Sequence, residues 1–197
     1  MKLATDLVRE DVGVVAHVND WPGRSAGEHL RQWPRILELA EAAATPPFVG
    51  VVLLGSFARG EADDLSDVDF TVFAAEGAFD TAWEQRHRLH PPDASCWDYP
   101  RPPGNRDVAA HRWLTTDFVL FDGLIATPSG TRLADPMHIL VGDDRLDGQI
   151  ERREPITAAE EHERKDEIAL HEVEQLYGRL KLALRAHRNP TFTSSSS

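Results

Sequence analysis

The chain has 197 residues, of which 41% are hydrophobic and 27% charged, which suits one globular domain with a modest helical appendage. It has no run of eighteen apolar residues that could span a membrane, and its single cysteine, Cys96, excludes an internal disulfide or a cysteine metal cluster. The formal net charge of −12 and the absence of a dense basic run argue against general nucleic-acid binding.

The acidic charge and the N-terminus set expectations about partners and location. An acidic surface would attract a cationic acceptor molecule, or it would simply keep the protein soluble. The first residues, Met1 to Asp6, lead into acidic residues rather than a continuous apolar stretch, so we expect no signal peptide. Together with the single cysteine, this predicts a cytoplasmic protein that makes no contact with a membrane.

The first predicted elements are a helix and a buried strand. Apolar residues recur at helical spacing over 26–44, and Pro34 marks either the true start of this helix or a kink. Pro46-Pro47 then ends it, so residues 1–47 are expected to form an N-terminal helical region. The run 48–54 is short, β-branched and apolar on both faces, which is typical of a central buried strand.

A turn, a second strand and several shorter elements follow. Residues 55–60 are expected to form a polar turn, and residues 68–73 a second strand. The later predictions, in chain order, are a helix over 78–89, an irregular loop over 91–106, a hairpin of 111–115 and 118–126 around Thr116-Asp117, and a strand over 137–141.

The C-terminal part is expected to be a long helix. Thr157 and Glu160 have the spacing of a capping box, and apolar residues follow them along one helical stripe. We therefore predict a C-terminal helix within 151–190 and a disordered tail over 191–197. The core between the two helical regions, residues 48–150, is predicted to be an α/β (α+β) domain built on a mixed β-sheet.

The end of the first strand carries a candidate nucleotide-binding turn. The strand ends at Gly55, where the missing side chain lets a phosphate come close to the backbone. Ser56 offers a hydroxyl and an amide at the point where a helix would begin, and unpaired amides at a helix N-terminus favour a triphosphate. Gly55 and Ser56 are therefore candidates for binding a nucleoside triphosphate.

The second strand begins with a candidate metal site. Asp67 and Asp69 are two residues apart, so on a strand both carboxylates point to the same face, whereas Val68 and Phe70 point into the core. Two neighbouring carboxylates repel each other unless a cation lies between them. Mg²⁺ is a hard ion that often bridges carboxylates to substrate phosphates, and a third carboxylate would allow two metal ions.

Two later aspartates compete for the place of that third carboxylate. Asp122 lies between apolar neighbours in a strand context, where an unpaired carboxylate is costly without a metal ion. Asp117 lies at the proposed hairpin turn, where an aspartate has an ordinary structural reason to occur. We prefer Asp122 as the third metal ligand and catalytic acid.

Two further residues near the motif allow two interpretations each. Arg59 would either contact the triphosphate or stay on the surface of the motif helix. Ser66, directly before Asp67, would either cap the local backbone or contact the nucleotide. Both are retained as candidate nucleotide-binding residues.

At these residues the chain resembles the DNA-polymerase-β-like nucleotidyltransferase superfamily, whose signature is Gly-Ser, a spacer and then Asp-apolar-Asp. Gly55, Ser56, Asp67 and Asp69 occupy the signature positions. The fuller pattern, Gly-Ser-x-Ala-Arg-Gly with Ser-Asp-x-Asp, is similar to that of the minimal nucleotidyltransferases and of those that modify aminoglycoside and lincosamide antibiotics. The specific likeness covers residues 53–73.

The resemblance implies a fold, an activity and roles for individual residues. In such relatives the Gly and Ser hold the triphosphate, the two acids bind Mg²⁺, and a third acid on a later strand completes the site. A looser likeness to the antibiotic-modifying group runs to about residue 143 and favours Asp122 as that acid. Acceptor choice lies outside the motif.

The leading functional hypothesis is a Mg²⁺-dependent enzyme that moves a nucleotidyl group, AMP from ATP, to a hydroxyl of a small molecule such as an aminoglycoside-like antibiotic. One alternative is an antitoxin-type nucleotidyltransferase that modifies a partner protein, and another is a catalytically inactive nucleotide-binding module. The acceptor hydroxyl would lose its proton to metal-bound solvent or to a nearby carboxylate, and that carboxylate would be Asp122 or a glutamate of the C-terminal region. Mg²⁺-dependent nucleotide turnover separates the enzymatic hypotheses from the inactive one.

Overall fold

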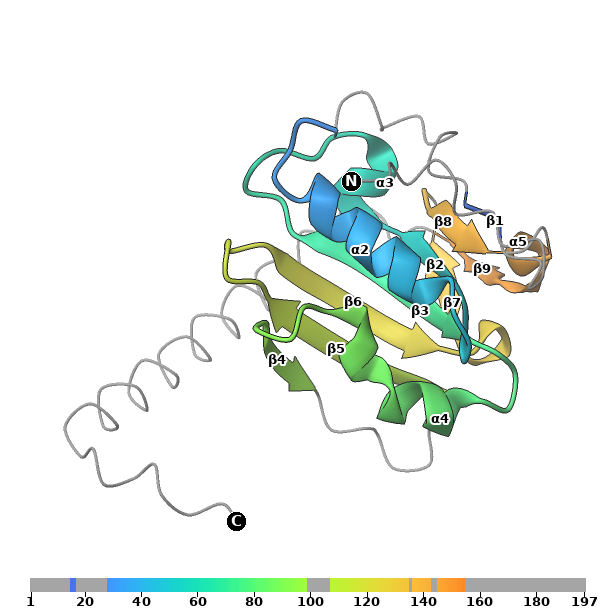
Figure 1. Ribbon diagram of the computed structural model, residues 1–197. Coiled ribbons are helices and arrows are strands. Elements are labelled where there is room, and N and C mark those ends of the chain that lie inside the picture. Colours follow the sequence, from blue (N-terminus) through green and yellow to red (C-terminus); the bar gives the residue numbers. More distant parts are fainter. Residues whose placement is uncertain (1–14, 17–27, 99–106, 135, 143–144, 155–197) are drawn as a thin grey trace, which may run out of the picture. The chain divides into compact units, whose positions relative to one another are not determined.

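A mixed sheet of seven strands forms the centre of the computed structural model, which describes residues 15–16, 28–98, 107–134, 136–142 and 145–154 (Figure 1). The strand order across the sheet is β1-β8-β2-β3-β6-β5-β4. In chain order the strands are β1 (Val15–Ala16), β2 (Phe48–Leu53), β3 (Val68–Ala74), β4 (Ser95–Asp98), β5 (Val108–Leu114), β6 (Leu120–Ala126) and β8 (His138–Gly142).

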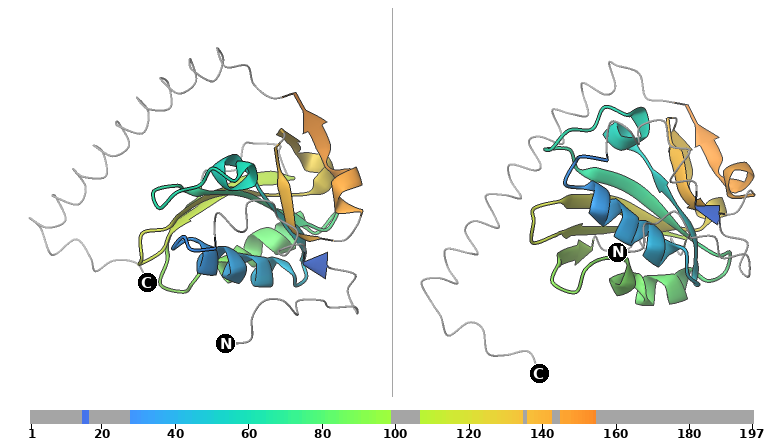
Figure 2. Two further views of the ribbon diagram at one scale, coloured as in Figure 1. Left: turned by 90° about the horizontal axis from the view of Figure 1, so that it is seen from above. Right: turned by 45° about the horizontal axis from the view of Figure 1, so that its top comes forward.

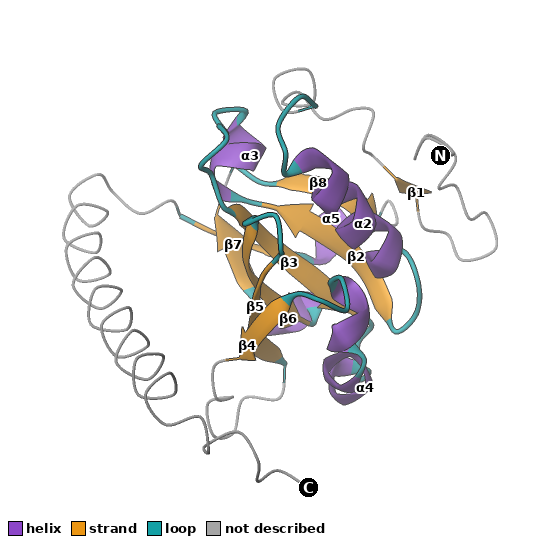
Figure 3. Cartoon of the chain, turned by 60° about the vertical axis from the view of Figure 1, so that its left-hand side comes forward, coloured by secondary structure: helices purple, strands orange, loops and turns teal. Residues whose placement is uncertain are grey.

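The central pair of strands differs from the others in direction. β3 and β6 run parallel, whereas the remaining neighbours in this sheet pair antiparallel. β2 therefore ends at the same edge of the sheet at which β3 and β6 begin. The short helix α3 (Gly55–Arg59) follows β2 directly at that edge (Figure 3).

One face of the sheet is covered by helices. α2 (Trp33–Ala43) buries its apolar stripe, including Ile36 and Leu39, while Pro34 lies in its first turn, where proline is tolerated. α4 (Phe79–Glu84) and the 3₁₀ helix η2 (Arg86–Leu89) follow β3. Figure 2 shows α2 and α4 on the same side of the sheet, and their buried residues form one cluster with Phe70 and Trp113.

A second, smaller apolar cluster lies on the other face. It joins Val52 and Phe73 of the sheet to Leu146 of α5 (Leu146–Gln149) and to Leu133 of β7. The two short strands β7 (Arg132–Ala134) and β9 (Glu151–Arg153) pair in parallel as a separate sheet, and the 3₁₀ helix η3 (Pro128–Gly130) precedes β7. This cluster covers one end of this face of the seven-stranded sheet, and the acidic residues lie at the other end, next to α3.

The structure confirms the mixed-sheet α+β core expected from the sequence. The strands predicted at 48–54 and 68–73 are β2 and β3, and the hairpin around Asp117 joins β5 to β6. The helix predicted over 26–44 begins only at Trp33 among the described residues.

Three further sequence predictions differ from the structure. Within the expected loop 91–106, Ser95–Asp98 form β4, a short polar edge strand that pairs with β5 and has no alternating apolar pattern to announce it. Val15–Ala16, in the expected N-terminal helical region, form β1 and pair with β8. Glu151–Arg153, at the start of the expected C-terminal helix, form β9.

The predicted capping box at Thr157, the rest of the helix to 190 and the tail 191–197 lie outside the described residues. Among the described residues, no helix is long and apolar enough to cross a membrane.

Candidate active site

The parallel pairing of β3 and β6 brings three aspartates together. Asp67 directly precedes β3, Asp69 lies within it on the same face, and Asp69 is the register partner of Asp122 on β6. One carboxylate oxygen from each of the three residues lies within 4.8 Å of the others. All three side chains are half-buried at the edge of the sheet next to α3.

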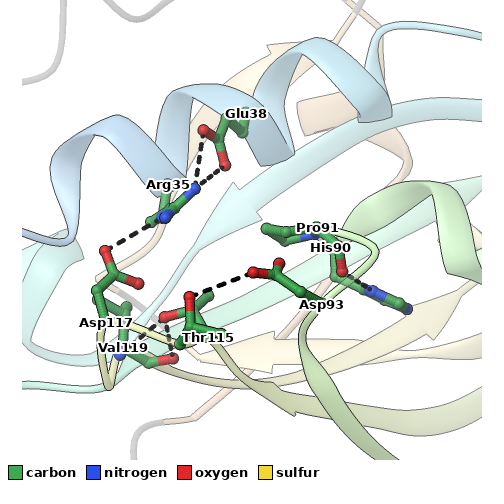
Figure 4. A network of polar contacts seen from close by, with 9 residues as sticks. Arg35, Glu38, His90, Pro91, Asp93, Thr115, Asp117 and Val119 are labelled. Atoms are coloured by element: carbon green, nitrogen blue, oxygen red, sulfur yellow. Dashed lines mark hydrogen bonds and ion pairs between the residues drawn. The ribbon is translucent and has the colours of Figure 1, made fainter.

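Asp117, the competing candidate, lies elsewhere. It belongs to the turn between β5 and β6, where Phe118 has a φ of +62° and Thr115 closes the turn through Val119. Its carboxylate accepts a hydrogen bond from Nε of Arg35 on α2 at 3.3 Å (Figure 4). A hydrogen bond from Thr115, and then the contact with Arg35, lower the pKa of Asp117. Of the two candidates, the structure brings only Asp122 to Asp67 and Asp69.

The electrostatics of the acidic triad, meaning Asp67, Asp69 and Asp122, fit a bound cation. Burial, and then repulsion by Asp67 and Asp122, raise the pKa of Asp69 to about 7, while Arg59 and Arg112 partly offset this rise. Three convergent carboxylate groups are the oxygen donors that Mg²⁺ prefers. The residues present therefore fit a divalent metal ion.

Gly55 lies directly against the triad. Its φ of +57° is in the left-handed region, and a Cβ built at this position would lie 2.0 Å from Oδ2 of Asp69. The N–H of the preceding residue, Leu54, donates a hydrogen bond of 2.9 Å to the backbone oxygen of Asp69. The glycine thus allows the turn into α3 to pass beside the acid, a reason that differs from the approach of a phosphate that the sequence suggested.

Ser56 and Arg59 follow on α3, next to the triad. Ser56 is the second residue of this five-residue helix and is half-buried. Arg59 has a 46% exposed side chain, and its Nε lies 2.6 Å from Oε2 of Glu61. The structure therefore places Arg59 at the surface, yet near enough to Asp69 to oppose the rise of its pKa.

Ser66 closes the turn that leads into Asp67. Its hydroxyl donates to Oδ1 of Asp63 at 2.9 Å and accepts a hydrogen bond from the N–H of Asp63 at 2.9 Å. These bonds give Ser66 the capping role that was one of its two interpretations. The hydrogen bond from Ser66 also lowers the pKa of Asp63.

Two residues near the site were not found from the sequence. Gln32, fully buried, donates from Nε2 to the backbone oxygens of Asp63 at 2.9 Å and of Ser66 at 2.8 Å. Arg112 on β5 is the register partner of Asp122, and its Nε donates to Oδ1 of that residue. Both contacts depend on pairings across the fold, and the chain itself gives no local pattern for them.

Comparison with known protein families identifies the same segment. Residues 38–119 match the family described as the nucleotidyltransferase domain, a stretch that includes Gly55, Ser56, Asp67 and Asp69. The match ends before Asp122, so the third acid rests on geometry alone. The comparison with curated proteins found no match.

The fold, the triad and the match define a transferase that moves nucleotidyl groups. This match over residues 38–119 supports the resemblance to the DNA-polymerase-β-like nucleotidyltransferase superfamily that the Gly-Ser and Asp-x-Asp residues predicted.

Proposed function

We propose that this nucleotidyltransferase transfers AMP from ATP to a hydroxyl of a small molecule such as an aminoglycoside-like antibiotic, and that it works with two Mg²⁺ ions. The observation that carries the proposal is the convergence of three carboxylates within 4.8 Å, beside the Gly55 turn. Asp67, Asp69 and Asp122 would hold the metal, and Mg²⁺, when bound, would neutralise charge that develops on the phosphoryl oxygens.

The residues around the triad divide the site into two sides. Gly55 and Ser56 lie on the β2 and α3 side, where the amide and the hydroxyl of Ser56 suit the triphosphate. Arg59 lies on the same helix and would add a positive charge near the phosphates. Asp122 lies on the β6 side, away from this turn, and would accept the proton that the acceptor hydroxyl loses.

The acceptor is proposed to be a cationic small molecule. The net charge of −12 favours approach of a positively charged acceptor over that of a nucleic acid. An aminoglycoside-like compound, with several amines and hydroxyls, has the required charge and nucleophile. The proposed setting is the cytoplasm, where ATP and Mg²⁺ are available.

The test is a transfer assay with labelled ATP, GTP, CTP and UTP, Mg²⁺ and a panel of aminoglycosides, lincosamides and neutral polyols. We expect labelled product with ATP and a cationic acceptor. Asp67→Asn and Asp69→Asn should each lower turnover by at least about a hundredfold with the fold retained, because each removes a proposed metal ligand.

Asp117→Asn is the matched control, because this aspartate contacts Arg35 instead of the triad. Its turnover should stay within about twofold of wild type, since an exposed ion pair contributes little. Turnover near the wild-type value in Asp69→Asn at saturating Mg²⁺ would contradict the proposed role of the triad.

A further inference from the structure

Asp69, Asp122 and Arg112 form one row across three neighbouring strands. Asp69 on β3 pairs in register with Asp122 on β6, and Asp122 pairs in register with Arg112 on β5. Register partners point to the same face, and neighbouring strands are about 4.8 Å apart. Asp122 therefore has a carboxylate on one side of it and a guanidinium on the other.

The contact between Arg112 and Asp122 is direct and partly shielded from water. Nε of Arg112 donates to Oδ1 of Asp122, and the two side chains are 25% and 31% exposed. A guanidinium that binds a carboxylate in a partly buried setting restricts the rotation of that carboxylate. Ligating carboxylates commonly depend on such hydrogen bonds for their orientation.

The geometry indicates that Arg112 orients the Asp122 carboxylate and does not compete with a metal ion for it. A cation that competed with the metal would occupy the space between the carboxylates. Arg112 instead approaches Asp122 from β5, whereas Asp67 and Asp69 approach it from β3. Arg59, the other cation that acts on Asp69, belongs to a different element and is paired with Glu61.

We propose that Arg112 is a positioning residue that holds the Asp122 carboxylate in the orientation needed to complete a divalent metal site. The inference rests on the proposed function of the triad. It makes a prediction opposite to that of simple electrostatics, in which removal of a nearby positive charge strengthens metal binding.

The test measures Mn²⁺ binding by electron paramagnetic resonance on the full chain without nucleotide. Arg112→Met should weaken Mn²⁺ binding by about tenfold, within the range found for residues that support metal ligands. Arg35→Met is the matched control, because Arg35 is 27% exposed and is also bound to an aspartate, Asp117, away from the triad. It removes the same charge and should leave Mn²⁺ affinity within about twofold of wild type.

Two further variants keep the test informative if Arg112→Met folds poorly by circular dichroism. Arg112→Gln keeps a donor for Asp122 without the charge, and Arg112→Lys keeps the charge without the planar guanidinium. Both should bind Mn²⁺ with an affinity between those of wild type and Arg112→Met. Unchanged or tighter binding in Arg112→Met or Arg112→Gln would overturn the proposal.

The design separates this inference from the proposed function. Asp69→Asn should abolish Mn²⁺ binding if the triad is a metal site. Wild-type protein that binds no Mn²⁺, or that binds it as well with Asp69→Asn, would overturn the triad and the inference together. Wild-type binding that depends on Asp69 but is unaffected by Arg112→Met would overturn the inference alone.

Discussion

At the scale of single residues, Gly55 meets two requirements that the sequence motif combines in one position. Its backbone is in the left-handed region, which costs a residue with a Cβ about 1–2 kcal/mol. Its missing side chain also leaves space for the Asp69 carboxylate, which a Cβ would approach to 2.0 Å. The left-handed backbone affects only the stability of the fold, whereas the missing side chain affects the position of the Asp69 carboxylate.

Gly55→Ala should therefore affect both stability and metal binding. The left-handed backbone should lower the free energy of unfolding by about 1–2 kcal/mol, and the displaced Asp69 should weaken Mn²⁺ binding. Gly77→Ala is the matched control, since Gly77 has a φ of +76° but a Cβ added there would meet nothing within 4 Å. Urea unfolding and Mn²⁺ titration of both variants check this, and equal Mn²⁺ affinities would show that the close approach to Asp69 is unimportant.

At the scale of elements, the loop between α3 and β3 is fixed from outside. Gln32 lies just before α2 and is fully buried, and its side-chain amide donates to the backbone oxygens of Asp63 and Ser66. The second of these oxygens belongs to the residue directly before Asp67. A residue at the start of a helix thus restrains the backbone that carries a proposed metal ligand.

Gln32→Leu should loosen this loop while α2 stays packed. Each net hydrogen bond contributes about 1 kcal/mol, and the carbonyl of Asp63 in the exposed turn can accept from water, so we expect a loss of about 1–2 kcal/mol in stability. Native-state hydrogen exchange should show faster exchange at the amides of residues 65–67. Gln149→Leu, at an exposed position in α5, is the control and should change neither quantity. Unaltered exchange in Gln32→Leu would show that the loop is held by its own contacts, such as those of Ser66.

The sequence predicted the features that depend on residues close together in the chain, and it did not predict those that depend on pairing between strands. The strands β2 and β3 and the Gly55 to Asp69 motif are contiguous, so apolar patterning and spacing were enough to predict them. Arg112 contacts Asp122 only because β5 and β6 pair in one register, and a shift of one residue would turn it to the opposite face. β4 was missed because its residues are exposed or half-buried at the edge of the sheet.

At the scale of the whole described domain, the two faces of the sheet carry two titratable groups, one buried and one half-buried, whose pKa values shift in opposite directions. On the helix-covered face, burial lowers the pKa of His111, although its Nδ1 lies 2.7 Å from Oδ1 of Asp98. On the other face, burial and repulsion raise the pKa of Asp69 to about 7. The unfolded chain binds the proton more readily at His111, and the folded chain binds it more readily at Asp69.

These shifts predict how stability without metal depends on pH. Because the pKa of Asp69 is 3.8 in its ordinary state and about 7 in the fold, its contribution to stability falls as pH rises from about 4 to 7. Asp67 and Asp122 add to this effect, and Arg59 and Arg112 reduce it. His111 acts in the other direction and lowers stability as pH falls below 6.5. The wild-type curve therefore contains both contributions.

The difference between wild type and Asp69→Asn isolates the carboxylate, since both proteins keep His111. In EDTA, Asp69→Asn should gain stability relative to wild type as pH rises from about 5 to about 7.5, by a few kcal/mol at most. Saturating Mg²⁺ should remove this advantage, because a bound cation stabilises the charged form of Asp69 in the wild type. Urea unfolding across this pH range, with and without Mg²⁺, measures the difference. A constant difference between the two proteins across the range would mean that Asp69 ionises normally and that burial and repulsion in the triad do not raise its pKa.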